Sequence, residues 1–290
     1  MEHRSSEWNA DRPPRSALYV PGHRADLLGR ALERGADSLI VDLEDAVPLD
    51  QKDVARAAVA HWLAGLEPGD CAVWVRVNPG AARLADVEAV AAAPALAGIC
   101  LAKTDDVGEV EAVADLLTWS GSAAAIAPVL ETATAVLAAP AIARAPRVRR
   151  LQLGEADLVG ELGLEPDEIQ TELAWIRTMV VLASSAAGLQ PPLGPVATDF
   201  RDLDALRASS LRLRRAGFRG RACIHPAQLD VVHEVFTPSE SEVAAAREAV
   251  ERFDAAGGGA VVGADGTLVD EAVVRRSRRI LAQASEPSGP

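Results

Sequence analysis

The chain has 290 residues, which is long enough for one or two domains with a large buried core. Only 3% of the residues are aromatic and the net charge is −13, so a stacking platform or a basic surface for nucleic acid is excluded. The cysteines Cys71, Cys100 and Cys223 lie far apart, each in or beside an apolar run, which indicates buried thiols and no disulfide framework. The polar N-terminus does not resemble a signal peptide, and no apolar run approaches the ~20 residues that span a bilayer. We therefore expect a cytoplasmic protein with no nucleic-acid or membrane partner.

Short apolar segments alternate with helical patterns along most of the chain. The predicted strands cover residues 16–20, 38–43, 71–77, 98–102, 125–130, 151–153, 193–197 and 220–224. The predicted helices cover about 25–34, 50–63, 82–92, 107–117, an Ala-rich segment after 134, 166–186, 200–215, 227–235 and 239–255. Eight strands that alternate with helices predict an α/β fold, a (β/α)₈ TIM barrel. A doubly wound open sheet is the alternative, but no G-x-G-x-x-G follows the first strand.

The two ends of the chain depart from this alternation. We expect a flexible arm at residues 1–14, the barrel domain at 15–255, and a C-terminal lid segment and tail at 256–290. The last part opens with a Gly-rich break, which precedes a small hairpin with an Asp-Gly turn. An arginine-rich helix then begins at Asp270, and the final residues are expected to be disordered. The predicted fold is thus a TIM barrel with a C-terminal helical and hairpin lid extension.

Polar residues accumulate where the predicted strands end. They are Asp42, Glu44, Arg76, Asn78, Lys103, Glu131, Asp157, Asp199 and His225. A single charge in such a place can simply keep a loop soluble. Active sites of TIM barrels, however, lie at the carboxyl ends of the strands. The repetition at nearly every strand therefore predicts a common site.

Glu131 and Asp157 follow two successive predicted strands that a helix connects. Parallel strands joined in this way lie side by side, so both carboxylates are expected at one edge of the sheet. Two carboxylates with room for water suit Mg²⁺. The alternative is that both acids only stabilise helix N-termini through the helix dipole.

A series of short motifs occurs in a specific order along the chain. They are Tyr-Val-Pro-Gly-His-Arg (19–24), Val-Asp-Leu-Glu-Asp-Ala-Val (41–47), Val-Arg-Val-Asn (75–78), Leu-Glu-Thr-Ala (130–133), Gly-Glu-Ala-Asp-Leu (154–158), Thr-Asp-Phe (198–200), Cys-Ile-His-Pro-Ala-Gln (223–228) and Val-Phe-Thr-Pro-Ser (235–239). With them the chain resembles the citrate lyase β-subunit-like family, in the wider group of Mg²⁺-dependent HpcH/HpaI-type aldolases and malyl-CoA lyases. The resemblance extends from about Arg15 to Ala282.

The resemblance implies a Mg²⁺-dependent carbon–carbon lyase that acts on a coenzyme A thioester. The expected reaction is the reversible cleavage of a 3-hydroxyacyl-CoA, such as citramalyl-, malyl- or citryl-CoA, to acetyl-CoA and a 2-oxo acid. The alternatives are an acyl-CoA thioesterase, a malate-synthase-like condensing enzyme, and the β subunit of a citrate lyase that acts on an acyl-carrier thioester. The resemblance also implies a homo-oligomer, either a trimer or a hexamer. The chain departs from the family at His23, where Asp is frequent, and at Ala102, where Pro is frequent.

The reaction assigns roles to the residues at the strand ends. Glu131 and Asp157 are the expected metal ligands. The expected substrate-binding residues are Arg76, Lys103, Glu131, Gly154 and Asp157. Arg76 can clamp a carboxylate or polarise the forming keto oxygen, and its alternative role is a salt bridge to Asp42 or Glu44 across the barrel mouth. Glu44 or Asp45 can hold a metal-bound water, and we place Glu44 with Arg76 in the catalytic set.

Residues outside the strand ends complete the predicted site. Asp270 is the third catalytic candidate because a carboxylate in a closing lid can move a proton, and its alternative role is a helix N-cap. Arg24 and Arg30 can meet the phosphates of coenzyme A, or they can simply form a solvated helix face. His225 is expected to cap a turn. The arginine run at 144–150 is expected at the opposite end of the barrel, as a surface or subunit contact.

Overall fold

The computed structural model describes residues 13–262, 266 and 268–284. The chain divides into two compact units, Met1–His233 and Glu234–Pro290. The predicted flexible arm, except for its last two residues, the predicted disordered end and most of the Asp-Gly turn lie outside the described residues. Within the described residues, no helix is both long enough and apolar enough to cross a membrane.

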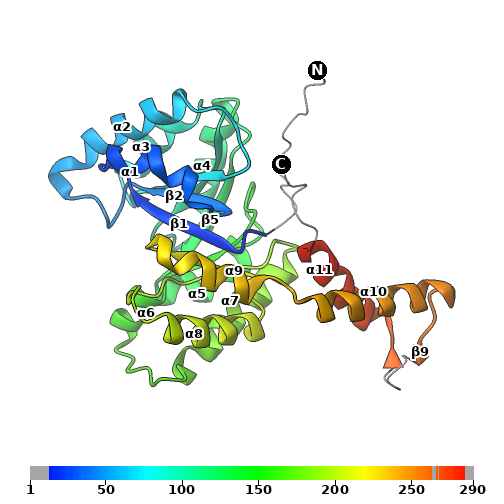
Figure 1. Cartoon of the computed structure of the whole chain (residues 1–290). Coiled ribbons are helices and arrows are strands. Elements are labelled where there is room, and N and C mark those ends of the chain that lie inside the picture. Colours follow the sequence, from blue (N-terminus) through cyan, green and yellow to red (C-terminus); the bar gives the residue numbers. More distant parts are fainter. Residues whose placement is uncertain (1–12, 263–265, 267, 285–290) are drawn as a thin grey trace. The chain divides into compact units, whose positions relative to one another are not determined.

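The first unit contains a closed barrel of eight parallel strands (Figure 1). They are β1 (Ser16–Pro21), β2 (Ser38–Asp42), β3 (Ala72–Val77), β4 (Leu96–Leu101), β5 (Ala125–Leu130), β6 (Gln152–Leu153), β7 (Leu193–Gly194) and β8 (Gly220–Cys223). Each strand pairs with the next one along the chain, and β1 also pairs with β8, which closes the barrel. The TIM-barrel prediction is confirmed.

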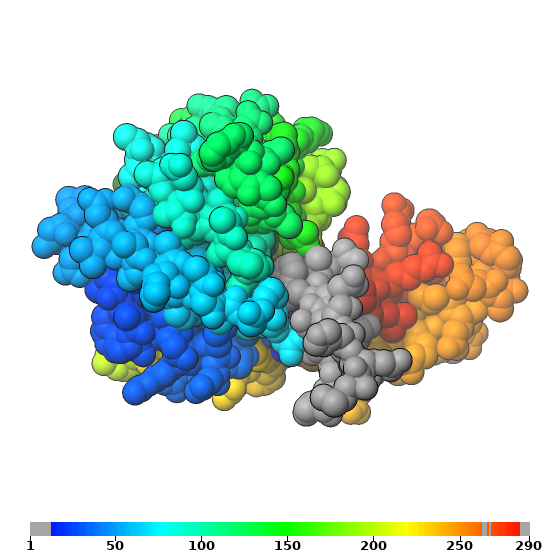
Figure 2. All heavy atoms as spheres, turned by 90° about the horizontal axis from the view of Figure 1, so that it is seen from above, coloured from blue at the N-terminus to red at the C-terminus, as the bar shows by residue number. Residues whose placement is uncertain are grey.

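Helices connect the strands along the outside of the barrel. They are α1 (Ala25–Ala31), α2 (Lys52–Ala64), α3 (Ala82–Val90), α4 (Val107–Trp119), α5 (Ala133–Ile142), α6 (Glu155–Leu162), α7 (Ala174–Ala186), α8 (Leu203–Ala216) and α9 (Leu229–Phe236), which crosses the division between the units. Consecutive helices from α2 to α5 pack against one another, and Figure 2 shows them as neighbouring colours from blue to green. This right-handed βα succession brings all strand ends to one face.

Between residues 154 and 174 one predicted helix was assigned too early a start, and one helix was missed. The sequence suggested one helix over 166–186, but α7 begins at Ala174, because Gln170 has a φ of +59° and interrupts any helix there. Helix α6 was not predicted. It has only eight residues and ends at Gly163, which has a φ of +61°, so its apolar periodicity is too short to recognise.

The barrel interior is filled by side chains that alternate inward along the strands. One buried cluster contains Ala17, Ile40, Ala72, Trp74, Cys100, Ala125, Ala127, Val129, Leu193 and Ala222. The Trp74 ring lies against Gly98, where a Cβ would come within 2.2 Å of the Trp74 Cζ3 atom. The interior therefore contains one large ring among many small side chains.

The second unit is a helical pair with a short hairpin. Helix α10 (Glu240–Ala255) packs against α11 (Glu271–Ala284), and β9 (Val261–Val262) pairs with β10 (Leu268–Val269) in the antiparallel arrangement that the sequence predicted. A small apolar core joins them through Phe253, Val269 and Val274. The sequence-based division at residue 255 placed α10 with the barrel, whereas α10 belongs to this second unit.

Candidate active site

Glu131 and Gly154 directly follow the neighbouring strands β5 and β6. The two strands pair in parallel with Leu130 opposite Leu153, and the Gly154 N–H donates to the Leu130 carbonyl at 3.0 Å. Asp157 lies in the first turn of α6 and is exposed. The two predicted metal ligands thus come from adjacent strand ends of the barrel.

The Glu131 carboxylate is held in an environment that opposes its charge. The residue is only 2% exposed, and its Oε1 accepts a hydrogen bond of 2.6 Å from the Lys103 backbone N–H. The pKa of Glu131 is raised to about 7, mainly by burial; the Lys103 N–H lowers it, the charges of Asp157 and Glu44 raise it, and the Arg76 charge lowers it. The negative charges of Asp157 and Glu44 thus act on the Glu131 carboxylate, and such an arrangement of acids favours a cation.

The helix-dipole alternative explains Asp157 better than it explains Glu131. Asp157 does lie in the first turn of α6, where a negative charge is favourable. Glu131, however, precedes the true N-cap of α5, Thr132, whose side chain accepts a hydrogen bond from the Ala135 N–H. The burial of Glu131 is thus not explained by capping.

Gly154 makes room for the Glu131 side chain. A Cβ on Gly154 would lie 2.5 Å from the Glu131 Cβ and 2.7 Å from its Oε2. We predict that Gly154→Ala displaces the carboxylate, destabilises the fold by about 1–3 kcal/mol through overpacking and weakens Mg²⁺ binding. Thermal unfolding and calorimetric Mg²⁺ titration measure the two effects.

Gly160 on α6 provides the matched control for this substitution. A Cβ there meets nothing within 4 Å, so Gly160→Ala should stabilise the helix by up to about 1 kcal/mol and leave Mg²⁺ binding unchanged. If the Gly154→Ala protein bound Mg²⁺ as tightly as the Gly160→Ala protein, Gly154 would not be needed to make room for the Glu131 carboxylate.

Arg76 is fixed at the centre of a charged network. Its Nε and Nη2 donate to the two carboxylate oxygens of Asp42 at 2.6 and 2.7 Å, and its Nη1 lies 3.0 Å from Glu44 Oε2. Burial lowers the pKa of Arg76, but the Asp42 hydrogen bonds and the nearby negative charges outweigh burial and raise it. The salt-bridge alternative is therefore what the structure contains. The contact of Arg76 with substrate stays a prediction.

Lys103 links Glu131 to Glu44. Its Nζ lies 2.7 Å from Glu44 Oε1, while its backbone N–H binds Glu131. Lys103 has a φ of +48°, an unfavourable conformation for a lysine, which aims the backbone N–H and the side chain at two different carboxylates. Burial raises the pKa of Glu44 and the neighbouring Asp45 adds to this, against the opposing charges of Arg76 and Lys103. At Glu44 the effect of burial thus exceeds that of the two cations.

Two further residues of the site were missed in the sequence. The Tyr19 ring lies 5.0 Å from the Arg76 Cζ, and the Gln152 Nε2 donates to the Tyr19 hydroxyl at 2.6 Å. Tyr19 is the only tyrosine in the chain. It lies two positions after the inward-facing Ala17 on β1, so its side chain lies on the same face of the strand, which could have indicated an interior position. The sequence contains no comparable signal for Gln152.

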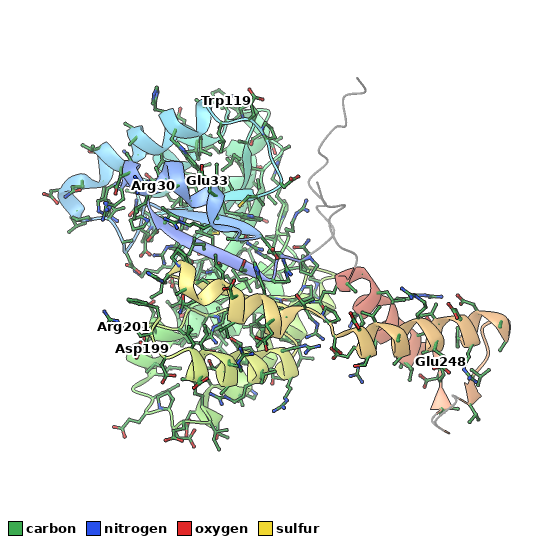
Figure 3. The ribbon with its side chains drawn as sticks, viewed as in Figure 1. Arg30, Glu33, Trp119, Asp199, Arg201 and Glu248 are labelled. Carbon is green, nitrogen blue, oxygen red and sulfur yellow. The ribbon has the colours of Figure 1, made fainter. Side chains whose placement is uncertain are left out.

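Three polar residues at the strand ends do not join this network. Asn78 donates from both its backbone and its side chain to the buried carboxylate of Asp86. Asp199 accepts backbone N–H bonds within its own loop (Figure 3). His225 caps the following turn, as predicted, and stacks on Phe200 at 4.5 Å.

The predicted coenzyme A contacts lie on exposed parts of the first unit. Arg24 holds the exposed carboxylate of Asp26 with its Nε and Nη2, at 2.8 and 2.7 Å. Arg30 is exposed on α1 (Figure 3). An exposed ion pair such as that of Arg24 is weak and easily exchanged for a phosphate, so both roles stay predictions.

Asp270 has the N-cap geometry that was its alternative reading. Its Oδ1 accepts hydrogen bonds from the backbone N–H groups of Ala272 and Val273 at 2.9 and 3.0 Å. These bonds satisfy the first turn of α11. The catalytic role of Asp270 stays a prediction.

The residues present fit Mg²⁺ better than a softer metal. The described residues contain no group of three or more His, Cys, Asp or Glu side chains that could enclose a metal. Mg²⁺ commonly takes one or two protein carboxylates and completes its shell with water and substrate oxygens. Glu131 and Asp157 supply that number of hard oxygen donors, and a cation bound there would compensate the buried charge of Glu131, whose pKa burial raises.

Comparison with known proteins agrees with this geometry. The model of the HpcH/HpaI aldolase/citrate lyase family matches residues 15–226. The chain is 36% identical over 282 residues to (3S)-malyl-CoA thioesterase of Cereibacter sphaeroides, covering 94% of this chain and 95% of that protein. It is 32% identical over 285 residues to the citrate lyase subunit beta of Escherichia coli, covering 94% of each.

A solved structure shows the same architecture. The CitE protein of Mycobacterium tuberculosis, in complex with magnesium, acetoacetate and coenzyme A, matches with a TM-score of 0.77 at 28% identity. The match covers 96% of this chain and 100% of that one. The solved structure agrees with the barrel fold, the family match and the relatives agree with one another, and the chain belongs to the HpcH/HpaI aldolase/citrate lyase family of enzymes.

Proposed function

We propose that the protein is a Mg²⁺-dependent carbon–carbon lyase that cleaves a 3-hydroxyacyl-CoA reversibly to acetyl-CoA and a 2-oxo acid. Malyl-, citramalyl- and citryl-CoA are the substrates in view. The observation that carries the proposal is the buried Glu131 carboxylate, which has a pKa of about 7, is influenced by the charge of Asp157, and accepts a hydrogen bond from the Lys103 backbone next to the network of Arg76, Lys103 and Glu44. The CitE structure with bound magnesium and coenzyme A supports the same ligands for this family member.

Each residue of the network has a task in this reaction. Bound Mg²⁺ would polarise the substrate hydroxyl and carboxylate and lower the hydroxyl pKa. Asp42 and Tyr19 hold the Arg76 guanidinium in place, so that its charge can stabilise the alkoxide that forms when the substrate hydroxyl loses its proton, the oxygen that becomes the keto oxygen of the oxo acid. Glu44 is proposed to accept the proton that the hydroxyl loses, and the carboxyl group of Asp270 is proposed to protonate the acetyl-CoA enolate that the cleavage leaves. Arg24 and Arg30 are proposed to meet the phosphates of coenzyme A.

A second candidate reaction is hydrolysis of the thioester of a malyl-CoA. It is favoured by the 36% identity with (3S)-malyl-CoA thioesterase over nearly the whole chain. Both reactions use a chelated hydroxy acid and a polarised thioester, so the same residues serve either one. Condensation of acetyl-CoA with a 2-oxo acid, and cleavage of an acyl-carrier thioester as a citrate lyase subunit, use the same groups.

One assay separates these candidates. Malyl-, citramalyl- and citryl-CoA are each incubated with the protein and Mg²⁺, and the 2-oxo acid is trapped as its phenylhydrazone while free thiol is measured in parallel. The lyase produces oxo acid and acetyl-CoA without free thiol. Thiol release without oxo acid supports the thioesterase. Absence of both products from every substrate would overturn the two proposals together.

The affinity for Mg²⁺ should rise with pH up to neutrality. Only the ionised Glu131 binds a metal, and its pKa is about 7, so affinity should weaken by about tenfold per pH unit below 7 and level off above it. In the metal-free protein, ionisation of Glu131 has the opposite effect on folding stability: it is unfavourable. The folded state holds this proton more tightly than the unfolded chain, so the contribution of Glu131 to stability falls as pH rises from its ordinary pKa toward 7. Calorimetric titration between pH 5.5 and 8.5 measures the affinity, and a flat profile would contradict the assignment.

Asp270→Asn tests the predicted catalytic carboxylate without removing the cap. Asparagine caps helices as well as aspartate, so the Tm should stay unchanged while turnover falls by about 100-fold or more if the carboxylate moves a proton.

We also propose a homo-oligomer in which Asp270 serves the site of a neighbouring subunit. Mixing inactive Asp270→Asn and Glu131→Gln proteins should then restore part of the activity. Wild-type turnover in Asp270→Asn would leave only the capping role.

A further inference from the structure

Arg150 is a buried guanidinium inside the barrel. It is 1% exposed, and its Cζ lies 4.5 Å from the Trp74 ring, which belongs to the interior cluster. The sequence suggested a surface or subunit contact for the whole arginine run at 144–150, and for Arg150 this was wrong. The residue lies two positions before the inward-facing Gln152, so strand alternation turns Arg150 to the same side.

The edge of Arg150 that normally binds an anion has no partner. Its Nε and Nη2 are both buried, and neither makes a hydrogen bond to any described residue. These two nitrogens form the fork that grips a carboxylate bidentately. Elsewhere the chain uses this fork in the pairs Arg15–Asp37, Arg24–Asp26, Arg76–Asp42 and Arg177–Glu155.

The charge of Arg150 also lacks a counter-charge among the described residues. Burial lowers its pKa, but a guanidinium remains protonated in proteins. The acidic groups that act on it are the Cys100 thiol and the Tyr19 phenol. Burial raises the pKa of Cys100 to about 12 and that of Tyr19 above its ordinary value, so both are neutral near pH 7. An isolated buried charge of this kind is strongly unfavourable.

The surrounding interior is built from small side chains. Alanine occupies five positions of the interior cluster, namely 17, 72, 125, 127 and 222, where branched side chains are usual in such barrels. The Trp74 Nε1 is a further buried donor without a partner among the described residues. Unsatisfied buried donors beside small side chains indicate a bound species that supplies acceptors.

We propose that the Nε–Nη2 fork of Arg150 binds a small monovalent anion of the chloride class inside the barrel. Such an ion supplies the missing negative charge and accepts both hydrogen bonds at once. A water molecule could join the fork to Gln152 Oε1, which is buried and also without a partner among the described residues, but it would leave the charge uncompensated. The site is separate from the strand-end carboxylates and does not depend on the proposed reaction.

Thermal unfolding tests the anion site. The Tm of the wild-type protein is measured from 5 to 500 mM chloride against gluconate at the same ionic strength. Mass action predicts a rise of about 5 °C specific to chloride when the ion reaches about 100 times its Kd. Arg150→Met should lose this increment, and Arg150→Lys, which keeps the charge without the fork, should retain only part of it. Arg177→Met, which removes a buried fork paired with Glu155, should lower the Tm but keep the chloride increment.

Crystals of the wild-type protein grown with bromide give a second measurement that does not depend on variant folding. An anomalous peak at the Arg150 fork supports the proposal. Equal Tm curves in chloride and gluconate, the same chloride increment in Arg150→Met, or ordered water at the fork without an anomalous peak would each overturn it.

Discussion

Glu131→Gln is expected to abolish Mg²⁺-dependent turnover while leaving the barrel folded. Glutamine keeps the volume of the side chain but removes the negative charge of a ligand. Substitution of a residue that hydrogen-bonds to a metal ligand commonly lowers activity by about 10–100-fold, so substitution of the ligand itself should lower it by about 100-fold or more. The Tm of the metal-free protein at pH 8 should stay equal or rise, because the substitution removes a buried charge that Asp157 repels. Steady-state kinetics, Mg²⁺ titration and thermal unfolding measure these effects.

Glu161→Gln is the matched control for Glu131→Gln. Glu161 lies on α6 and accepts a hydrogen bond from the Ala133 N–H, close in sequence to Glu131. Unlike Glu131, it is exposed. Its substitution should leave turnover and Mg²⁺ affinity unchanged. Asp157→Asn should resemble Glu131→Gln in Mg²⁺ binding. Wild-type turnover and affinity in Glu131→Gln would remove the metal site from this edge of the barrel.

Arg76→Lys is expected to lower kcat/KM by about 100-fold or more although the positive charge is kept. Lysine cannot reproduce the two parallel bonds to Asp42, so the charge would leave the position between Asp42 and Glu44. The Tm should also fall. Complete removal of one partner of a buried ion pair costs about 3–5 kcal/mol, and lysine retains part of that interaction. The kinetic loss should lie mainly in kcat, with Mg²⁺ affinity little changed.

Arg15→Lys separates the kinetic effect from the loss of stability. Arg15 holds Asp37 by the same fork, at 2.9 and 2.8 Å, but it precedes β1 at the opposite end of the barrel strands. This variant should lose stability and keep kcat/KM. If Arg76→Lys retained near-wild-type kcat/KM, Arg76 would be a structural residue only.

The order of elements, and the face of the barrel on which the candidate site lies, could be predicted from the sequence. Apolar runs, each followed by a helical pattern, indicate a barrel whatever the details of packing. The polar residues that end these runs, such as Arg76, Lys103 and Glu131, must then meet at one face, because all strands are parallel. Helix α6 escaped detection since a helix of eight residues has too few turns to display a period.

The contacts within the site and the interior were decided by tertiary structure alone. Tyr19 and Gln152 are 133 positions apart and Lys103 and Glu44 are 59 apart, so only closure of the barrel makes them partners. The strands are apolar on both faces, which hides from the sequence which side chains point inward. Arg150 shows the consequence. A charge in a basic run is typical of a surface, and only the curvature of the closed sheet places this one against Trp74 in the core.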